Sequence, residues 1–287
     1  MRPVLLLVPS SVLRPGRPDE HFVAEAAAAR ELGIGVELVN HDALTHPGGA
    51  DAAVRRVQGE GPAVYRGWML RSTEYQEFDD ALRRRGVTLA TSHEQYRRAH
   101  ELPGWYADLA DLTPRSSWTV GGERADFTEA CRVLGPGAAV LRDYTKSLKH
   151  HWDEAAFIPE LTDEDAAWSI ADRFRELRGT DMTGGYVIRR FETFTSAEVR
   201  TWWIHGTCHL TGPHPDTPND LPGTPVDTSA AAPLIAGLGL PFVTADFIQR
   251  ADGQWRIVEL GDGQVSDRPA TVPPEQLIDA LHTHIGV

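Results

Sequence analysis

Two acidic residues within apolar segments are the first candidates for chemistry in this sequence. The stretch Phe242–Gln264 has the pattern of two β-strands joined by a turn, with Asp246 in the first strand and Glu259 in the second. An unpaired carboxylate is costly to bury, so each acid needs a cation, a hydrogen-bond network or a metal. Carboxylates on adjacent strands provide the oxygen ligands that Mg²⁺ prefers. The alternative is an ordinary hairpin with one exposed and one salt-bridged acid.

A basic segment lies about a hundred residues before this pair. The run Leu141–Trp152 contains Arg142, Lys146 and Lys149, followed by two adjacent histidines. Several cationic donors on one loop suit a polyphosphate. The alternative is a solvated basic loop that balances nearby acids. Because adjacent residues of an extended segment face opposite ways, we expect one histidine to be exposed and one to be packed.

Two further arginines lie among residues with strong strand propensity. Arg189 and Arg200 must each face water or an anion if these segments are strands. For either arginine alone, a structural salt bridge is the favoured explanation. The histidines at 205, 209 and 214 have no spacing typical of a zinc site.

Composition limits the class of protein. The chain has 287 residues, a net charge of −13, and only two cysteines, which match no metal or redox spacing. The acidic balance argues against nucleic acid as a partner, and scarce cysteine is consistent with the cytoplasm. The initial apolar run is too short for a signal peptide and predicts a buried strand. No segment reaches the roughly 18 apolar residues needed to span a bilayer.

The elements expected along the chain fall into two parts. Strands and helices alternate over residues 1–90 and predict an α/β layer, but no glycine fingerprint of a dinucleotide-binding domain follows the first strand. A helical segment follows at 93–112, interrupted at Pro103-Gly104. Beyond a boundary near Thr113–Ser117, strands and helices are mixed. We expect Thr211–Pro225 to be a surface loop, because it has no apolar period.

The order of these features resembles an ATP-grasp enzyme. The basic strand and loop come first, then the strand Ile188–Glu192, then Glu198-Val-Arg200, and finally the pair Asp246 and Glu259. The pattern is most similar to a divergent bacterial clade related to the eukaryotic initiation-factor-two assembly protein. The segments Tyr65–Trp68 and Leu102–Tyr106 also resemble the bacterial branch. The ordered set carries the resemblance, since no single motif in it is highly specific.

The resemblance implies an ATP-grasp fold of mixed α/β and α+β class. An N-terminal α/β (pre-ATP-grasp) domain with a helical linker would occupy residues 1–113, and an ATP-grasp domain residues 114–287. The smaller lobe would cover about 114–190 and the larger lobe about 191–287, with ATP enclosed between them.

The resemblance also implies roles for individual residues. Arg200 and Lys146 would act in catalysis, and the phosphates would be contacted by Arg142, Lys146, Lys149, Arg200 and the nearby Arg189. Backbone groups of Arg190, Phe191 and Glu192 would meet the adenine, and the Glu192 side chain the ribose. Asp246 and Glu259 would hold Mg²⁺. Where the family often has an asparagine this chain has Gly261, so Asp262 and Gln264 are the candidates for a third ligand.

The activity implied is that of an ATP-dependent carboxylate–amine ligase that works through an acyl phosphate. Its substrate would be a peptide, a protein or an amino-acid-like metabolite. Two alternatives stay open: an ATP–Mg-binding assembly or chaperone protein without ligase activity, and a kinase-like phosphoryl transferase. The residues do not identify the carboxylate, the amine or the oligomeric state.

Overall fold

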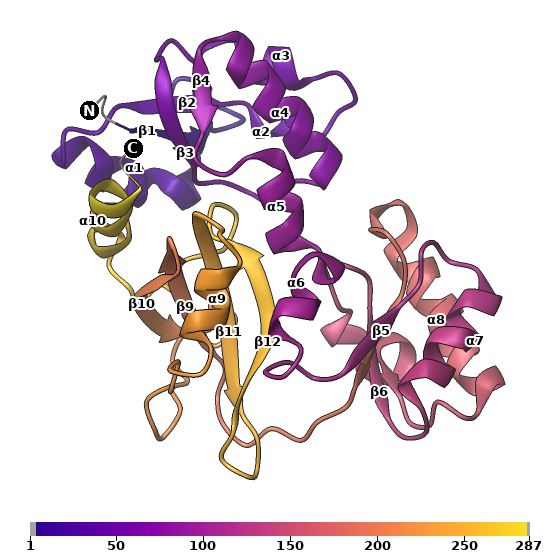
Figure 1. The fold of residues 1–287 in the computed structure, drawn as a ribbon. Helices are drawn as coiled ribbons and strands as arrows, with labels where there is room; N and C mark the ends of the chain where they lie inside the picture. The colour runs from indigo at the N-terminus through magenta and orange to yellow at the C-terminus, as the bar shows by residue number, and fades with distance from the viewer. Residues whose placement is uncertain (1–3, 286–287) are drawn as a thin grey trace.

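The computed structural model describes residues 4–285, and these form three bodies that meet around a central region (Figure 1). The N-terminal body is a parallel sheet with strand order β2-β1-β3-β4. Its strands are β1 (Leu5–Pro9), β2 (Val36–Val39), β3 (Gly61–Tyr65) and β4 (Val87–Leu89). Its helices are α1 (Val23–Glu31), α2 (His41–Leu44), α3 (Ala50–Ala53), α4 (Ser72–Arg84) and α5 (His93–His100).

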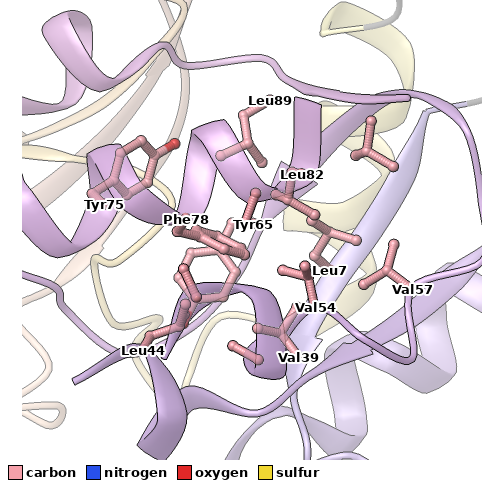
Figure 2. Packing of buried hydrophobic residues seen from close by; sticks show 14 of the residues in the cluster. Leu7, Val39, Leu44, Val54, Val57, Tyr65, Tyr75, Phe78, Leu82 and Leu89 are labelled. Atoms are coloured by element: carbon pink, nitrogen blue, oxygen red, sulfur yellow. The ribbon is translucent and has the colours of Figure 1, made fainter. Parts of the chain in front are cut away.

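Both faces of this parallel sheet are covered, which explains why β1 is a continuous apolar run. Leu7 points into one core cluster, which Figure 2 shows with Tyr65 and Phe78 packed between β3 and α4. Leu6 and Val8 point to the opposite face. There they meet α1 and the last helix, α10 (Pro274–His284), which returns to the N-terminal body (Figure 1).

The smaller lobe is an antiparallel sheet with order β5-β8-β6-β7 and two helices. Its elements are β5 (Ser116–Trp118), α7 (Arg124–Leu134), β6 (Ala139–Arg142), β7 (Phe157–Ile158), α8 (Glu164–Arg178) and β8 (Val187–Arg190). Between β6 and β7 the chain forms a 3₁₀ turn at Lys149–His151 and a π-helical turn at Trp152–Ala156. We did not expect β5, β7 or these turns, because such short segments show no hydrophobic period of their own.

The larger lobe is an antiparallel sheet with order β10-β9-β11-β12. Its elements are β9 (Val199–Ile204), β10 (Thr207–Pro213), α9 (Ala232–Gly237), β11 (Phe242–Gln249) and β12 (Trp255–Asp262). The linker helix α6 (Leu102–Leu109) packs with α9 on this sheet. The expected loop at 211–225 is wrong at its start, because residues 211–213 continue β10 by pairing with β9.

The arrangement agrees with the predicted N-terminal α/β layer followed by two further lobes, and the structure adds that the sheets of both lobes are antiparallel. The three sets of strands fall within 1–113, 114–190 and 191–287, and we retain those divisions as a proposal. The helices of residues 4–285 lack the length and apolar character needed to cross a membrane.

Candidate functional site

A cavity of about 450 Å³, here called the metal cavity, opens where the three bodies meet. The N-terminal body supplies Met69 and, from the end of its helix α5, His100. The smaller lobe supplies the loop from Lys146 to His151. The strands of the larger lobe supply the acids. This is a site that no single body could form.

A second cavity of about 240 Å³, the ring cavity, adjoins the first and shares Ser147, Lys149 and Glu259 with it. Its lining includes the aromatic side chains of Trp152 and Phe191 and aliphatic side chains from β6, β11 and β12. An apolar, aromatic-lined space beside a charged one suits a ligand with a flat ring at one end and charge at the other.

Asp246 and Glu259 lie directly opposite each other on β11 and β12, so their side chains share one face of the sheet. A register shift follows Asp246 immediately. Both Asp246 oxygens accept hydrogen bonds from Arg200, from Nε at 2.8 Å and from Nη2 at 2.7 Å. Arg200 stands opposite Asp246 on β9. Three paired strands therefore place these charges in one row.

The two carboxylates are not held in the same way. Burial alone would raise the pKa of Glu259, but Arg142, Lys146 and Arg200 outweigh it and lower the pKa to about 2. Glu259 is therefore ionised at neutral pH although only a distant cation, Arg142 Nη2 at 3.7 Å, lies beside it. Its side chain is about a third exposed, and an ionised carboxylate that opens onto the cavity provides an oxygen ligand suited to a divalent cation.

Two neighbouring residues extend this acidic group. Ligand atoms of Glu198, His214 and Asp246 lie within 4.8 Å of one another. Arg200 Nη2 lies 3.2 Å from His214 Nε2, and the Asp216 amide donates to His214 Nδ1. A neutral imidazole has only one lone pair, so His214 can accept from the Asp216 amide or from Arg200, but not from both. We therefore do not count His214 among the metal ligands.

Two buried arginines line the ring cavity, and of these only Arg142 has a carboxylate within 4.0 Å, that of Glu259 at 3.7 Å. Arg142 and Arg189 are each 6% exposed, and neither Nε has a hydrogen-bond partner in the described residues. Arg189 donates through its Nη atoms to Val258 O, Thr113 Oγ1 and Ile257 O. No carboxylate of residues 4–285 approaches Arg189 within 4.0 Å. Burial and the positive charge of Arg142 lower the pKa of Arg189 to about 9, so it remains protonated at neutral pH.

The two lysines of the basic loop occupy different positions. Lys149 lines both cavities and lies 3.8 Å from Glu198. Lys146 lines the metal cavity but not the ring cavity. Across the part of the chain that the structure describes, the Lys146 ammonium makes neither a hydrogen bond nor an ion pair.

The segment from Arg190 to Glu192 lines the ring cavity, but two of its side chains are already engaged. Arg190 turns its guanidinium away to carbonyls at the end of α7, donating to Leu134 O at 2.8 Å and Gly135 O at 3.1 Å. Both Glu192 oxygens accept from Arg256 at 3.0 Å. A ribose hydroxyl would have to share these oxygens. The backbone and the Phe191 ring remain available to a ligand.

The candidates for a third metal ligand are not brought to the metal cavity. Asp262 pairs with Val243 in the strand register, so it points to the other face of the sheet from Glu259. Gln264 is held there too, accepting from Tyr65 N at 2.9 Å and donating to Tyr75 Oη at 2.7 Å. We therefore withdraw Asp262 and Gln264 as ligands, because strand alternation directs them toward the N-terminal body.

Sequence reasoning did not select three residues that line these cavities: Glu198, His214 and His100. For Glu198 a signal existed, because it stands two residues before Arg200 and strand alternation puts both on one face. No signal existed for the histidines. His214 follows the end of β10 and His100 ends α5, and only tertiary packing brings them to the acids.

Comparison with known proteins places this geometry in context. A family model described as an ATP-grasp domain, R2K clade family 3, matches residues 133–281, slightly more than half of the chain. A search of curated proteins gave no match.

Solved structures of similar fold include three ligase-related proteins at low identity. A RimK domain protein ATP-grasp from Sphaerobacter thermophilus is 16% identical, with a TM-score of 0.62 over 96% of this chain and 98% of that one. D-cycloserine synthetase DcsG is 15% identical, with a TM-score of 0.63 over 98% and 100%. The ATP-grasp ligase PsnB, solved with a minimal precursor, Mg and ADP, is 16% identical, with a TM-score of 0.58 over 98% of each chain. These full-length likenesses confirm the predicted fold.

Proposed function

Because the chain belongs to the R2K clade of ATP-grasp domains, we propose that it is an ATP-dependent carboxylate–amine ligase. It would join a carboxylate to an amine as an amide, with ATP converted to ADP and phosphate. The substrate would be a peptide, a protein or an amino-acid-like molecule. PsnB, of similar fold, is an ATP-grasp ligase whose structure contains a precursor peptide.

The observation that carries the proposal is the presence of two kinds of charge in adjoining cavities. Buried Arg142 and Arg189 have unpartnered Nε atoms at the ring cavity. Glu259 is ionised where the two cavities join, and its one ion pair among residues 4–285 is with Arg142 at 3.7 Å. Groups of this kind favour ligands of opposite charge. A nucleotide polyphosphate satisfies the arginines and a divalent cation satisfies the acids.

In this assignment the ring cavity takes the adenine, with the Phe191 and Trp152 rings and the backbone at Arg190–Glu192 around it. Arg142 and Arg189, which line the ring cavity, and Lys149, which lines both cavities, contact the phosphates. Asp246 and Glu259 hold Mg²⁺, which would supply charge neutralisation for the transferring phosphoryl group. The third protein ligand is not assigned, and water can complete the coordination of Mg²⁺.

The chemistry needs positioned charge and no covalent nucleophile of the protein. A carboxylate oxygen of the substrate attacks the γ-phosphorus, the bond to the β-phosphate oxygen breaks, and ADP leaves with the electron pair. The amine nitrogen then attacks the acyl carbon, phosphate leaves, and the nitrogen loses a proton. Arg200, fixed by two hydrogen bonds to Asp246, lines the metal cavity, where it can stabilise the transferring group.

Replacing the paired acids tests the proposal. We expect Asp246→Asn or Glu259→Gln to lower substrate-dependent ADP formation by at least about 100-fold, a usual loss for a group that stabilises transition-state charge. The measurement is a coupled ADP assay with a panel of carboxylates and amines, together with mass detection of condensed products. Asp252→Asn, in the exposed turn of the same hairpin, is the control and should turn over normally. Unchanged turnover in both site variants would remove the metal assignment.

The second candidate function is a nucleotide-binding assembly or chaperone protein, to which the resemblance to the eukaryotic initiation-factor-two assembly protein points. It would also bind ATP–Mg, so binding alone does not separate the two. A stable nucleotide complex that releases no ADP with any amine and carboxylate would favour this function. A phosphorylated product without an amide would favour a kinase.

We place the activity in the cytoplasm, since both cysteines are free.

A further inference from the structure

A third space, the outer cavity, continues from the metal cavity on the side away from the ring cavity. It has a volume of about 460 Å³ and shares Met69, His100 and Lys146 with the metal cavity. It shares no lining residue with the ring cavity. The three spaces therefore follow one another, with the two carboxylates in the middle one. If the ring cavity holds adenine, the outer cavity is where the other substrate has room.

Two bodies build the walls of the outer cavity. The N-terminal body contributes Thr45 and the segment Met69–Glu74, and the smaller lobe contributes Thr145, Arg178, Asp181 and Thr183. Arg71 Nη2 joins the bodies by an ion pair with Asp181 at 2.7 Å. The lining also contains hydroxyl groups and the apolar side chains of Met69 and Leu70. Such a mixed lining suits a polar chain with several hydrogen-bonding groups better than a hydrocarbon.

The charges that line the outer cavity are paired, with one exception. Arg71 meets Asp181, and Arg178 Nη2 meets Asp143 at 2.8 Å. Glu74 accepts from the Arg71 amide at 2.8 Å. Lys146, at the junction with the metal cavity, is the remaining cation, and its ammonium has no partner within residues 4–285. An unpaired cation at this position favours a bound ligand that carries an anionic group.

His100 stands at the same junction. It is 8% exposed, and its ring makes no hydrogen bond to any residue that the structure describes. Burial, together with the charge of Lys146, lowers the pKa of His100 to about 4, so the ring is neutral at physiological pH. A neutral imidazole provides one donor and one acceptor. Because His100 lines both the metal cavity and the outer cavity and has no protein partner in the described residues, its ring is available to a ligand group.

From these observations we propose that the outer cavity binds the carboxylate substrate, with Lys146 holding the carboxylate that faces Glu259 and Asp246. His100 contacts the adjoining part of the same molecule. The space is within the range of about 300–1,000 Å³ that holds drug-sized ligands and exceeds what one amino acid fills. The substrate class is therefore an extended amino-acid chain with carboxylates. The inference rests on the proposed function and names the substrate class of that site.

This assignment divides the two lysines of the loop. Lys146 lines the metal and outer cavities, whereas Lys149 lines the metal and ring cavities. The first should therefore act on the carboxylate substrate and the second on the nucleotide. Each lysine is the matched control for the other.

Binding measurements on the full chain test the inference without turnover. The protein is saturated with Mg²⁺ and a non-hydrolysable ATP analogue and titrated calorimetrically with triglutamate, a probe with several carboxylates, and with free glutamate. We expect triglutamate to bind more tightly than glutamate. We expect Lys146→Met to weaken triglutamate binding roughly tenfold or more, the loss of one charge-assisted hydrogen bond, and Lys149→Met to weaken the analogue instead.

A bulky substitution gives an independent check. Thr183→Trp fills the outer cavity from its wall and should abolish triglutamate binding while the analogue binds as in the wild type. Thr180→Trp, three residues earlier and not part of the lining, should leave both unchanged. The inference is overturned if triglutamate does not bind, if Thr183→Trp has no effect on it, or if Lys146→Met weakens the analogue more than triglutamate. Failure of the proposed function has a different signature, namely absent nucleotide binding or absent ADP formation in the wild type.

Discussion

At the scale of single residues, the same side-chain type serves two purposes in one strand. Arg189 and Arg190 are neighbours on β8, yet Arg189 lies buried at the ring cavity and Arg190 caps the carbonyl end of α7. Alternation along the strand sends one to each side. The role of an arginine thus depends on the groups that it contacts. Two adjacent arginines can therefore have different roles.

This contrast predicts different outcomes for Arg142→Met and Arg190→Met. The first removes a cation with an unpartnered Nε from the ring cavity, so we expect the affinity for Mg·ADP to fall roughly tenfold or more, as for the loss of a bond to a charged group. The second removes hydrogen bonds to the end of α7, so we expect a lower melting temperature and an affinity within about twofold of the wild type. Fluorescence titration and calorimetry measure both. Equal losses of affinity would contradict the division of roles.

At the scale of elements, the β11–β12 hairpin separates a site face from a packing face. Glu259 faces the metal cavity, while Asp262, three residues later, faces the N-terminal body. There its Oδ1 accepts from the Gln264 amide at 3.0 Å and the Gln264 side chain at 3.1 Å. Its Oδ2 is buried and has no partner in the described chain. Asp262 therefore stabilises the turn that follows β12. The metal cavity is completed by residues of other elements.

The position of Asp262 predicts a dependence of stability on pH. Burial raises the pKa of Asp262 to about 7, above the value near 4 of an unfolded aspartate. Between these values the folded state binds more protons, so the free energy of unfolding falls as pH rises through this window, by about 1.4 kcal/mol for each pKa unit. Asp262→Asn mimics the protonated acid and should lack this loss. The melting temperature of the variant minus that of the wild type should therefore increase from pH 5 to pH 8. A difference that stays constant across this range would contradict the assignment.

At the scale of the whole molecule, the N-terminal body fixes the segment after β12 that forms one wall of the metal cavity. Arg66, 1% exposed, donates to Gly263 O at 2.6 Å, Gln264 O at 3.1 Å and Ser266 O at 2.9 Å. Glu25 fixes the same guanidinium through two hydrogen bonds. The turn after β12 thus depends on a residue almost two hundred positions earlier. Helix α10 adds a second link by packing on α1 (Figure 1).

A nucleotide that joins the lobes should stabilise the molecule as a unit. Mg·ADP at about 100 times its dissociation constant should add about 2.7 kcal/mol to the free energy of unfolding, which corresponds to a rise of several degrees in melting temperature. Differential scanning calorimetry with Mg²⁺ alone, and with ADP plus a chelator, provides the controls. We expect Glu259→Gln to reduce the effect of Mg²⁺. A wild-type melting temperature that ADP and Mg²⁺ leave unchanged would exclude a nucleotide site between the lobes.

Local patterns were enough to predict most of the elements and the order of the charged groups. The strands β1, β9, β11 and β12 and the helix α1 can be recognised from residues close in sequence, because each is marked by an apolar run or by residues of high strand or helix propensity. The carboxylates at 246 and 259 stood out for the same reason. Their flanking residues predicted burial, and burial of charge predicted a partner.

Tertiary structure alone decided which groups meet. Arg200 and Asp246 are paired by strand register, His100 and His214 reach the site from the ends of separate elements, and Gln264 is held by Tyr65. Asp262 was misassigned because the sequence did not show that β12 continues as far as Asp262, and only an unbroken strand puts this residue on the face opposite Glu259. Contacts between residues far apart in sequence depend on packing of whole layers, and no local period carries that information.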